Sequence, residues 1–423
     1  MSRLYKVGDN VRMQFHNGTV TFYSDDGTLW PDWLEKAGIK RDDVISVRVA
    51  EGTVFLPEDA SGWNVEEGCS ISLTTFGGLH NARLVDLRGF DTSRVTNMRR
   101  MFTDCHKLRL LYLNSFDTSN VTDMEGMFFN CKSITNIDLS SFNTSRVTDM
   151  SEMFWNCKNL AELDLTSFDT SNVTDMSRMF AYSEKLQNIN LGSFDTSNVT
   201  YMSSMFSHCK KLTDMDIKGF DTSNVTDMCM MFANCEFLKE VNLSKKTGKV
   251  ENMCGMFYGC SSIENLDLSE FDTSKTINMA SMFKGCASLT ELDLSSFDTS
   301  STTNMADMFC GCHSIKGINI SSFDGTKVRE TSGMFNGCKN LKDLDLSNFN
   351  APGIVNMQMM FCDCSGVTNI DLSGFDTSHL LYMQSMFAGC KKLQKVLLSP
   401  VVAQNVETDM IFKDCPAEIV QNL

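Results

Sequence analysis

A 26-residue pattern recurs along most of the chain and constrains its fold more than any other feature. A Met-Phe pair marks one position of the pattern twelve times, from Met101-Phe102 to Met386-Phe387, and Ile411-Phe412 is a weaker thirteenth copy. A second phenylalanine recurs at the same interval, with one longer step of 51 residues that spans a degenerate unit. Tandem units of this length pack on their neighbours, so the pattern predicts a solenoid rather than a series of globular domains.

Each unit contains three local signals. The two leucines of residues 163–165 flank an aspartate, as in a strand whose alternate side chains point inward. An Asp-Thr-Ser-Asn turn follows. Met176, Met179 and Phe180 then have the i, i+3, i+4 spacing of an apolar helical face, and Asp175 is placed to cap the start of such a helix. We therefore predict an α/β repeat solenoid of the leucine-rich-repeat type, with about thirteen coils that each hold a short parallel strand and a short helix.

The repeat also resembles a known family. Its consensus reads Leu-Asp-Leu-Ser-x-Phe-Asp-Thr-Ser-Asn-Val-Thr-Asp-Met-x-x-Met-Phe-x-x-Cys and covers about four-fifths of the chain. This string resembles the BspA-type leucine-rich repeats of bacterial surface proteins, which are also found in mycoplasma surface regions. The resemblance implies a surface or secreted location and adhesion to host proteins or to other cells.

Residues 1–75 lack the repeat and are predicted to form an N-terminal cap, because a solenoid otherwise exposes the apolar face of its first coil. Trp30, Trp33 and Trp63 are interpreted as the core of this cap. Residues 76–399 are assigned to the solenoid and residues 400–423, which include Pro400-Val401-Val402, to a degenerate C-terminal capping repeat. Within the cap, the sequence predicts strands at residues 19–23, 44–49 and 53–56, a turn at 25–27 and a short helix at 30–38.

Carboxylates form two columns when the repeats are aligned. One column lies between the last two leucines of the strand and the other lies two residues earlier, so both are expected to point outward on the strand face, the concave side of leucine-rich repeats. Neighbouring carboxylates repel one another, so lysines, ions or a ligand must offset the cost. We predict a docking face for a basic protein; the alternative is a solvated face that prevents aggregation. The candidate partner-binding residues are Asp138, Asp164, Asp216, Asp267, Asp293, Asp345 and Asp371 in the first column and Glu162, Asp214, Glu240, Glu291 and Asp343 in the second.

Twelve cysteines form a third column, three residues after the Met-Phe phenylalanine, with Ser183 in one unit. This column lacks paired Cys-x-x-Cys motifs, so it indicates a small buried side chain under the helix rather than a metal or redox site. No metal and no cofactor are predicted. Cys229 and Cys254, outside this column, occupy equal positions in adjacent coils and are close enough for a disulfide in an oxidising compartment. The total of 17 cysteines is odd, which favours a reducing setting.

The turn threonines form a fourth column, represented by Thr118, Thr144 and Thr170. Turn formation explains these residues, and an exposed face that orders water or ice is the alternative. Catalysis is not expected, since the six histidines share no spacing and no phosphate loop or nucleophile elbow occurs. The repeated carboxylates share one environment, which gives no means of separating two pKa values for acid and base roles.

The chain has 53 acidic and 37 basic residues, a formal net charge of -16, so it should be repelled by nucleic acid and by anionic lipid surfaces. The sequence contains no run of about eighteen apolar residues, so membrane insertion is not predicted. The first residues do not resemble a signal peptide, so a cytoplasmic location is the alternative to the cell surface. We predict a non-catalytic protein-binding or adhesion scaffold of unspecified oligomeric state. The alternatives are an intracellular recognition module, such as a sensor or immunity-type receptor, and a structural spacer.

Overall fold

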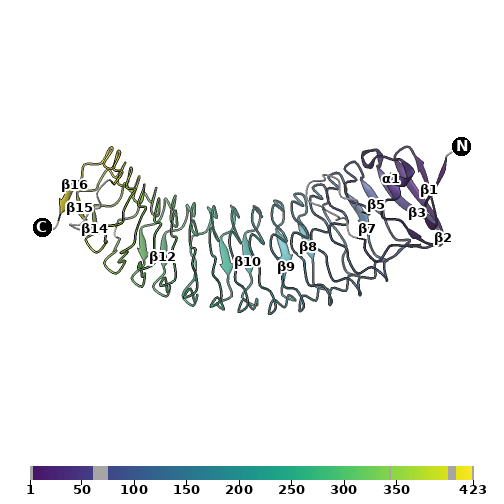
Figure 1. The fold of residues 1–423 in the computed structure, drawn as a ribbon, viewed down its shortest axis with the longest axis horizontal. Helices are drawn as coiled ribbons and strands as arrows, with labels where there is room; N and C mark the ends of the chain where they lie inside the picture. The colour runs from purple at the N-terminus through teal and green to yellow at the C-terminus, as the bar shows by residue number, and fades with distance from the viewer. Residues whose placement is uncertain (1–2, 61–74, 343, 399–405, 422–423) are drawn as a thin grey trace. The chain divides into compact units, whose positions relative to one another are not determined.

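The computed structural model describes residues 3–60, 75–342, 344–398 and 406–421. These residues form a β-solenoid of about 14 turns, in which short strands of successive coils lie side by side and pair in parallel (Figure 1). The chain divides into two compact units, Met1–Val199 with Met205–Leu212 and Thr200–Ser204 with Thr213–Leu423. Within each unit, equal positions of successive repeats stand next to one another, as the sequence predicts.

The first unit begins with nine elements: β1 (Leu4–His16), β2 (Thr19–Leu29), α1 (Trp33–Ala37), the 3-10 helix η1 (Arg41–Asp43), β3 (Ser46–Glu51), β4 (Val54–Phe55), β5 (Leu84–Asp86), β6 (Phe90–Asp91) and β7 (Leu110–Tyr112). Their strands form one sheet in the order β6-β4-β2-β3-β5-β7, with β1 antiparallel to β2 and the other pairs parallel. The parallel register of the solenoid therefore begins at β2, so that β1 is the one antiparallel strand of this sheet.

Most of the secondary structure predicted for residues 1–75 is present. The three strands correspond to parts of β2, β3 and β4, and the helix corresponds to α1, which ends at a left-handed Gly38. The turn predicted at residues 25–27 is wrong, because these residues belong to β2. Asp26 adopts a φ of 54° within a β-bulge opposite Asn10, and the bulge absorbs the turn-forming residues without ending the strand. Strand β1 was not predicted.

The tryptophans of the cap differ in burial. Trp33 is fully buried and packs edge-on against Phe22 at 5.2 Å, which confirms its predicted role in the core. Trp30 is half-buried, with the Lys6 ammonium 5.7 Å from its ring. Trp63 lies outside the described residues. Phe22 also contacts Phe90 of the repeat region at 5.6 Å, so the cap core continues into the solenoid core.

The later repeats contribute strands β8 (Glu162–Asp164), β9 (Asn188–Asn190), β10 (Asp214–Asp216), β11 (Glu240–Asn242), β12 (Glu291–Asp293), β13 (Gly317–Asn319), β14 (Asn369–Leu372), β15 (Lys395–Leu398) and β16 (Glu418–Gln421). In β8, β10 and β12 the central residue is buried and its two neighbours are exposed. This alternation confirms the predicted strand in these repeats, whereas the corresponding residues 136–138 and 265–267 do not form a strand. Near the C-terminus, Phe412 stacks on Phe387 at 5.2 Å, while Pro400-Val401-Val402 lies outside the described residues.

The short helix predicted in each coil is wrong; in the described ranges the helices are α1 and η1 alone. Residues 177–182 form consecutive turns, because Arg178 and Tyr182 have left-handed φ values of 56° and 62° that a right-handed helix excludes. The N–H of Phe180 donates to the carbonyl of Met205 at 3.0 Å, and the N–H of Tyr182 donates to Ser207 at 2.7 Å. Alternate amides therefore bond to the next coil instead of within a helix.

A signal for these turns is present in the sequence, in the residue that precedes each column cysteine. This residue is usually glycine, asparagine or aspartate, the types that tolerate positive φ. This residue has a positive φ in every repeat from residue 104 to residue 414. The members are Asp104, Asn130, Asn156, Tyr182, His208, Asn234, Gly259, Gly285, Gly311, Gly337, Asp363, Gly389 and Asp414.

The column cysteines and the Met-Phe phenylalanines together form the centre of the solenoid. The phenylalanine rings stack from coil to coil, as in Phe283 and Phe309 with ring centroids 5.7 Å apart. Each buried thiol donates to a phenylalanine carbonyl of the preceding coil, as Cys312 does to Phe283 at 3.1 Å. Ser183 makes the same bond, to Phe154 at 3.0 Å, so serine can take the place of cysteine there. The predicted burial is confirmed for eleven of the twelve column cysteines, although no helix covers them, and Cys415 is half-buried.

The turn threonines are buried, so the exposed water-ordering face is wrong. Each hydroxyl instead connects two coils. The Thr144 hydroxyl donates to the carbonyl of Asp169 and accepts from the N–H of the same residue, both at 2.8 Å. The column is at most 2 % exposed at Thr118, Thr144, Thr170, Thr196, Thr222, Thr273 and Thr299.

Candidate binding surface on the strand face

The predicted partner-binding carboxylates lie on the outward face of the strands. Of the twelve, Asp343 lies outside the described residues and the other eleven are exposed. Three of these belong to the first unit, namely Asp138, Glu162 and Asp164. The second unit contains Asp214, Asp216, Glu240, Asp267, Glu291, Asp293, Asp345 and Asp371.

Asparagines separate several of these charges. In the paired strands, Asp164 stands opposite Asn190, and Asp293 stands opposite Asn319. Asp214 and Glu240 form a like-charged pair in register. Paired parallel strands lie about 4.8 Å apart, so replacing alternate aspartates by asparagine removes the largest repulsions along the column.

Each aspartate of the first column also closes a turn. One carboxylate oxygen accepts the N–H of the residue two positions later, at 3.0 Å from Ser295 to Asp293 and 2.9 Å from Ser347 to Asp345. The N–H and hydroxyl of Ser295 lower the pKa of Asp293, and the hydroxyl and N–H of Ser347 lower the pKa of Asp345. The side chains are therefore charged at neutral pH and fixed in orientation. The sequence analysis recognised the outward direction of these residues but not their role in the turn.

A lysine offsets part of the charge in the second unit. The Lys245 ammonium lies 3.3 Å from Asp267 and 2.9 Å from Glu270. The Ser269 hydroxyl and N–H, together with this lysine, lower the pKa of Asp267 to about 2. Lys245 belongs to the shortened repeat, so this irregular coil supplies one of the compensating charges predicted from the sequence.

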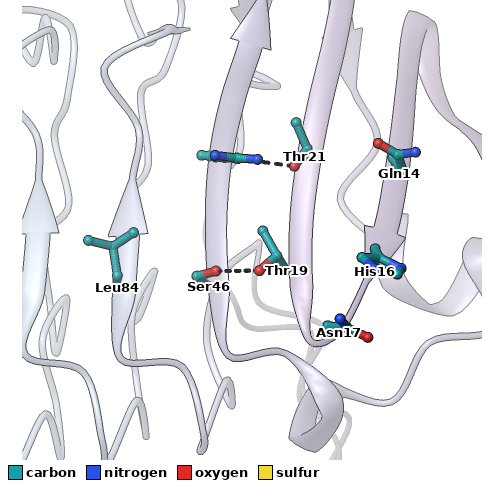
Figure 2. Close-up of a pocket in the computed structure, with 8 residues that line it drawn as sticks. Gln14, His16, Asn17, Thr19, Thr21, Ser46 and Leu84 are labelled. Carbon is teal, nitrogen blue, oxygen red and sulfur yellow. Dashed lines mark hydrogen bonds between the residues drawn. The ribbon is translucent and has the colours of Figure 1, made fainter. Parts of the chain in front are cut away.

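The strand face of the first unit has a different chemistry at its N-terminal end. A polar pocket of about 700 Å³ opens on β1, β2 and β3 (Figure 2). The Ser46 hydroxyl donates to Thr19 at 3.0 Å, and the Arg48 guanidinium donates to Thr21 at 3.3 Å. The lining residues are Gln14, His16, Asn17, Thr19, Thr21, Ser46, Arg48 and Leu84, so hydroxyls and one guanidinium replace the carboxylates. This pocket was not predicted; its signal in the sequence is the alternating Thr-x-Thr and Ser-x-Arg of adjacent strands.

A second hollow, of about 500 Å³, lies at the start of the first acidic column. Asp138 lines it together with Arg88, Arg109 and Tyr112. The Arg88 guanidinium is 4.8 Å from the Tyr112 ring and forms an ion pair with Asp86 at 2.6 Å. Asp138 is therefore a predicted carboxylate that shares a hollow with arginines.

A further carboxylate column, half-buried, runs along the Asp-Met turns of the first unit. Asp123, Asp149 and Asp175 join successive coils through parallel backbone bridges. Asp175, predicted to cap a helix, accepts the N–H of Ser177 at 2.7 Å and so closes a turn. Burial, followed by the nearby charge of Asp149, raises the pKa of Asp123 and of Asp175.

Neutralising this half-buried column should stabilise the protein. A carboxyl group with a raised pKa binds more protons in the folded chain than in the unfolded chain. The folded state is therefore favoured at low pH, and this contribution is lost as the pH rises through the folded pKa. We expect Asp123→Asn with Asp175→Asn to raise the free energy of unfolding at neutral pH by about 0.5 kcal/mol. The gain should disappear near pH 3, where the carboxyl groups are protonated. Urea denaturation at both pH values measures it.

Asparagine is a suitable replacement because Asn278 occupies the equivalent position and accepts the N–H of Ala280 at 3.0 Å. The control is Asp169→Asn, at an exposed aspartate whose pKa is lowered by the Ser171 hydroxyl and N–H. This change should not stabilise at neutral pH. If the double variant were less stable than the unmodified protein at neutral pH, that result would contradict repulsion within the half-buried carboxylate column.

In the described part of the chain, no group of three histidine, cysteine or acidic side chains is arranged to hold a metal ion. Over the same residues, no helix is long and apolar enough to cross a membrane.

Comparison with known proteins gives one family match. Residues 72–163, 157–245, 239–319 and 311–422 match the family model described as "Mycoplasma protein of unknown function, DUF285". No curated protein sequence matches the chain.

Several solved leucine-rich repeat structures are similar over most of the chain. A leucine-rich repeat protein from Eubacterium ventriosum is 16% identical, with 100% of this chain and 97% of that chain covered and a TM-score of 0.36. A leucine rich cell surface protein from Faecalibacterium prausnitzii is 12% identical, with 99% and 95% covered and a TM-score of 0.31. The functional domain of InlJ from Listeria monocytogenes is 13% identical, with 90% and 67% covered and a TM-score of 0.27.

Proposed function

The chain belongs to the family of mycoplasma proteins of unknown function DUF285, and we propose that it is a non-catalytic scaffold that binds a basic protein through its acidic strand face. The observation that carries the proposal is the column of exposed aspartates whose carboxylates are oriented by backbone hydrogen bonds, as in Asp293 and Asp345. Fixed charges lose little conformational freedom on binding, so they can contribute to affinity more than flexible surface charges do.

The location is part of this proposal. The likeness of the repeat to BspA-type repeats supports a cell-surface or secreted protein, and an intracellular recognition module is the alternative. Surface proteolysis of intact cells distinguishes them: a surface protein is cleaved while a cytoplasmic marker stays intact. Protection of the chain until the cells are lysed would favour the intracellular module.

The binding proposal is tested by removing charge without disturbing the turns. Asp216, Asp293, Asp345 and Asp371 all accept the N–H two residues later, and Asn319 makes the same bond at 3.2 Å. We therefore expect the fourfold Asp→Asn variant to fold normally. Exposed ion pairs contribute roughly 0.2–1 kcal/mol each, so its affinity for a fluorescent oligolysine peptide should fall about tenfold or more. Fluorescence anisotropy over a range of salt concentrations measures this loss and the expected weaker salt dependence.

The chain offers a matched control with the same change in net charge. Asp272, Asp298, Asp324 and Asp376 form the turn column beyond the buried phenylalanine and accept equivalent N–H groups. Asn143 occupies this column naturally. The fourfold Asp→Asn variant of the turn column should retain most of the affinity. Equal losses in both variants would show a response to net charge alone, and no loss in either would favour a structural spacer.

A further inference from the structure

A pair of cysteines outside the buried column lies on adjacent coils of the second unit. Cys229 and Cys254 are both half-buried, and their side chains are hydrogen-bonded to each other. The backbones are held in register on both sides of the pair. Asp227 and Asn252 form a parallel bridge, and the N–H of Met230 donates to the carbonyl of Cys254 at 2.7 Å.

This geometry suits a disulfide. Paired coils lie about 4.8 Å apart, within the range of Cα separations that a disulfide bridges. Each cysteine is anchored by a turn, because the N–H of Cys229 bonds to the Asp227 carboxylate at 2.8 Å and the N–H of Cys254 bonds to the Asn252 amide oxygen at 3.2 Å. The two side chains therefore leave the backbone at equal positions and meet without a rearrangement of the coils.

The column cysteines are also stacked coil on coil, but they are not equivalent to this pair. Cys260 and Cys286 are fully buried, and their thiols donate to phenylalanine carbonyls. Burial raises the pKa of Cys260 to about 12 and that of Cys286 well above the ordinary value. Thiolates are the reactive species, so the buried column is inert to disulfide exchange while a half-buried pair is not.

The electrostatic surroundings favour one member of the pair as the attacking group. The hydrogen bond from Cys229 lowers the pKa of Cys254 to about 7 and raises the pKa of Cys229. The Asp227 carboxylate is the nearby charge, and it opposes ionisation of both thiols. At the equivalent positions of the flanking coils stand the uncharged residues Ser203 and Ala280.

We propose that Cys229 and Cys254 form a reversible disulfide that staples two adjacent coils, with a low-molecular-weight disulfide as the oxidant. The Cys254 thiolate attacks one sulfur of the oxidant, whose S–S bond breaks and releases one thiolate. The Cys229 thiol then loses its proton and attacks the Cys254 sulfur, which expels the second thiolate. Overall, two protein thiols are oxidised to one disulfide, and the oxidant is reduced to two thiols.

The position of this staple is informative. Cys229 and Cys254 are 25 residues apart because the coil between them is the shortened unit. Other threonine hydroxyls of this column donate to an aspartate or asparagine carbonyl. The Thr222 hydroxyl donates instead to Ser244 and to the carbonyl of Lys246. The disulfide would therefore join the chain across a coil that is one residue shorter than the 26-residue pattern.

The first test uses the full chain and oxidised glutathione. The folded protein is oxidised near neutral pH, free thiols are alkylated after denaturation, and peptides are mapped by mass spectrometry without reduction. We expect one linked pair, Cys229 with Cys254, which dithiothreitol reverses. Cys310 and Cys362 are the comparison, since both are half-buried and lie two coils apart. A linked peptide between these two with equal yield, or no Cys229–Cys254 link, would overturn the proposal.

The second test measures the alkylation rate of Cys254 by iodoacetamide as a function of pH. Near pH 7, Cys254 should react about fivefold faster than Cys310, after allowance for the lower nucleophilicity of a low-pKa thiolate. Cys229→Ser retains a hydrogen-bond donor and should retain the midpoint near pH 7. Cys229→Ala removes the donor and should move the midpoint towards the value of an ordinary thiol. Identical profiles in the two variants would refute the contact between the thiols.

Discussion

Replacing Phe309 by alanine is expected to lower the free energy of unfolding by about 3–5 kcal/mol, the largest effect of any substitution considered. Phe309 is fully buried. Its ring stacks between Phe283 at 5.7 Å and Phe335 at 5.5 Å. Truncation leaves a cavity at the centre of the coil and removes two ring contacts, each of about 0.5–1.5 kcal/mol.

The loss of stability caused by Phe309→Ala should appear first in the coils next to Phe309. Each coil of a solenoid contacts only its neighbours, so weakening one interface uncouples the coils on either side. Hydrogen exchange should therefore accelerate first in residues 283–335, and the urea midpoint should fall. The control is Ile277→Thr, because Ile277 is 46% exposed and most units have threonine at this position. Protection in residues 283–335 that survives Phe309→Ala would contradict a continuous phenylalanine core.

Replacing Thr299 by valine is expected to lower the free energy of unfolding by about 2–4 kcal/mol although the two side chains have nearly the same shape. The Thr299 hydroxyl donates to the carbonyl of Asp324 at 2.9 Å and accepts from its N–H at 2.7 Å. Valine leaves both backbone groups without this partner at a fully buried position. An unsatisfied buried polar group costs about 1–3 kcal/mol, so two such groups account for the estimate.

Thr299→Ser is the matched variant. Serine keeps the hydroxyl and removes one methyl group, so its cost should stay near 1 kcal/mol. Urea denaturation of the two variants therefore separates the hydrogen bonds from the packing of the methyl group. A serine variant that is less stable than the valine variant would show that the methyl group, and not the hydroxyl, maintains the contact between coils.

The residue pattern was sufficient to predict the strands and the stacking of equal positions. Leu163 and Leu165 are buried and Asp164 between them is exposed, as the period-two alternation requires. The outward direction of the acidic columns follows from the same rule. Their binding role remains a prediction, because exposure alone does not identify a partner.

The local sequence pattern could not decide whether the Met-Phe segment of each repeat forms a helix or consecutive turns. The spacing of Met176, Met179 and Phe180 is compatible with one helical face and also with consecutive turns that bury the same three side chains. The choice depends on the sign of φ at Arg178 and Tyr182, and this sign follows the hydrogen bonds to the next coil. Aligning the residues before the column cysteines would have revealed the preference for glycine, asparagine and aspartate.

The sequence by itself determined the repeat length, the alternation of buried and exposed residues in each repeat and the residues that share a column, because these depend on periodicity along one chain. Tertiary structure alone decided that Thr170 is buried and that Asp293 closes a turn. Each of these depends on where a neighbouring coil places its backbone or side chain. A repeat states which residues are equivalent, whereas only the stacked coils determine what each equivalent residue touches.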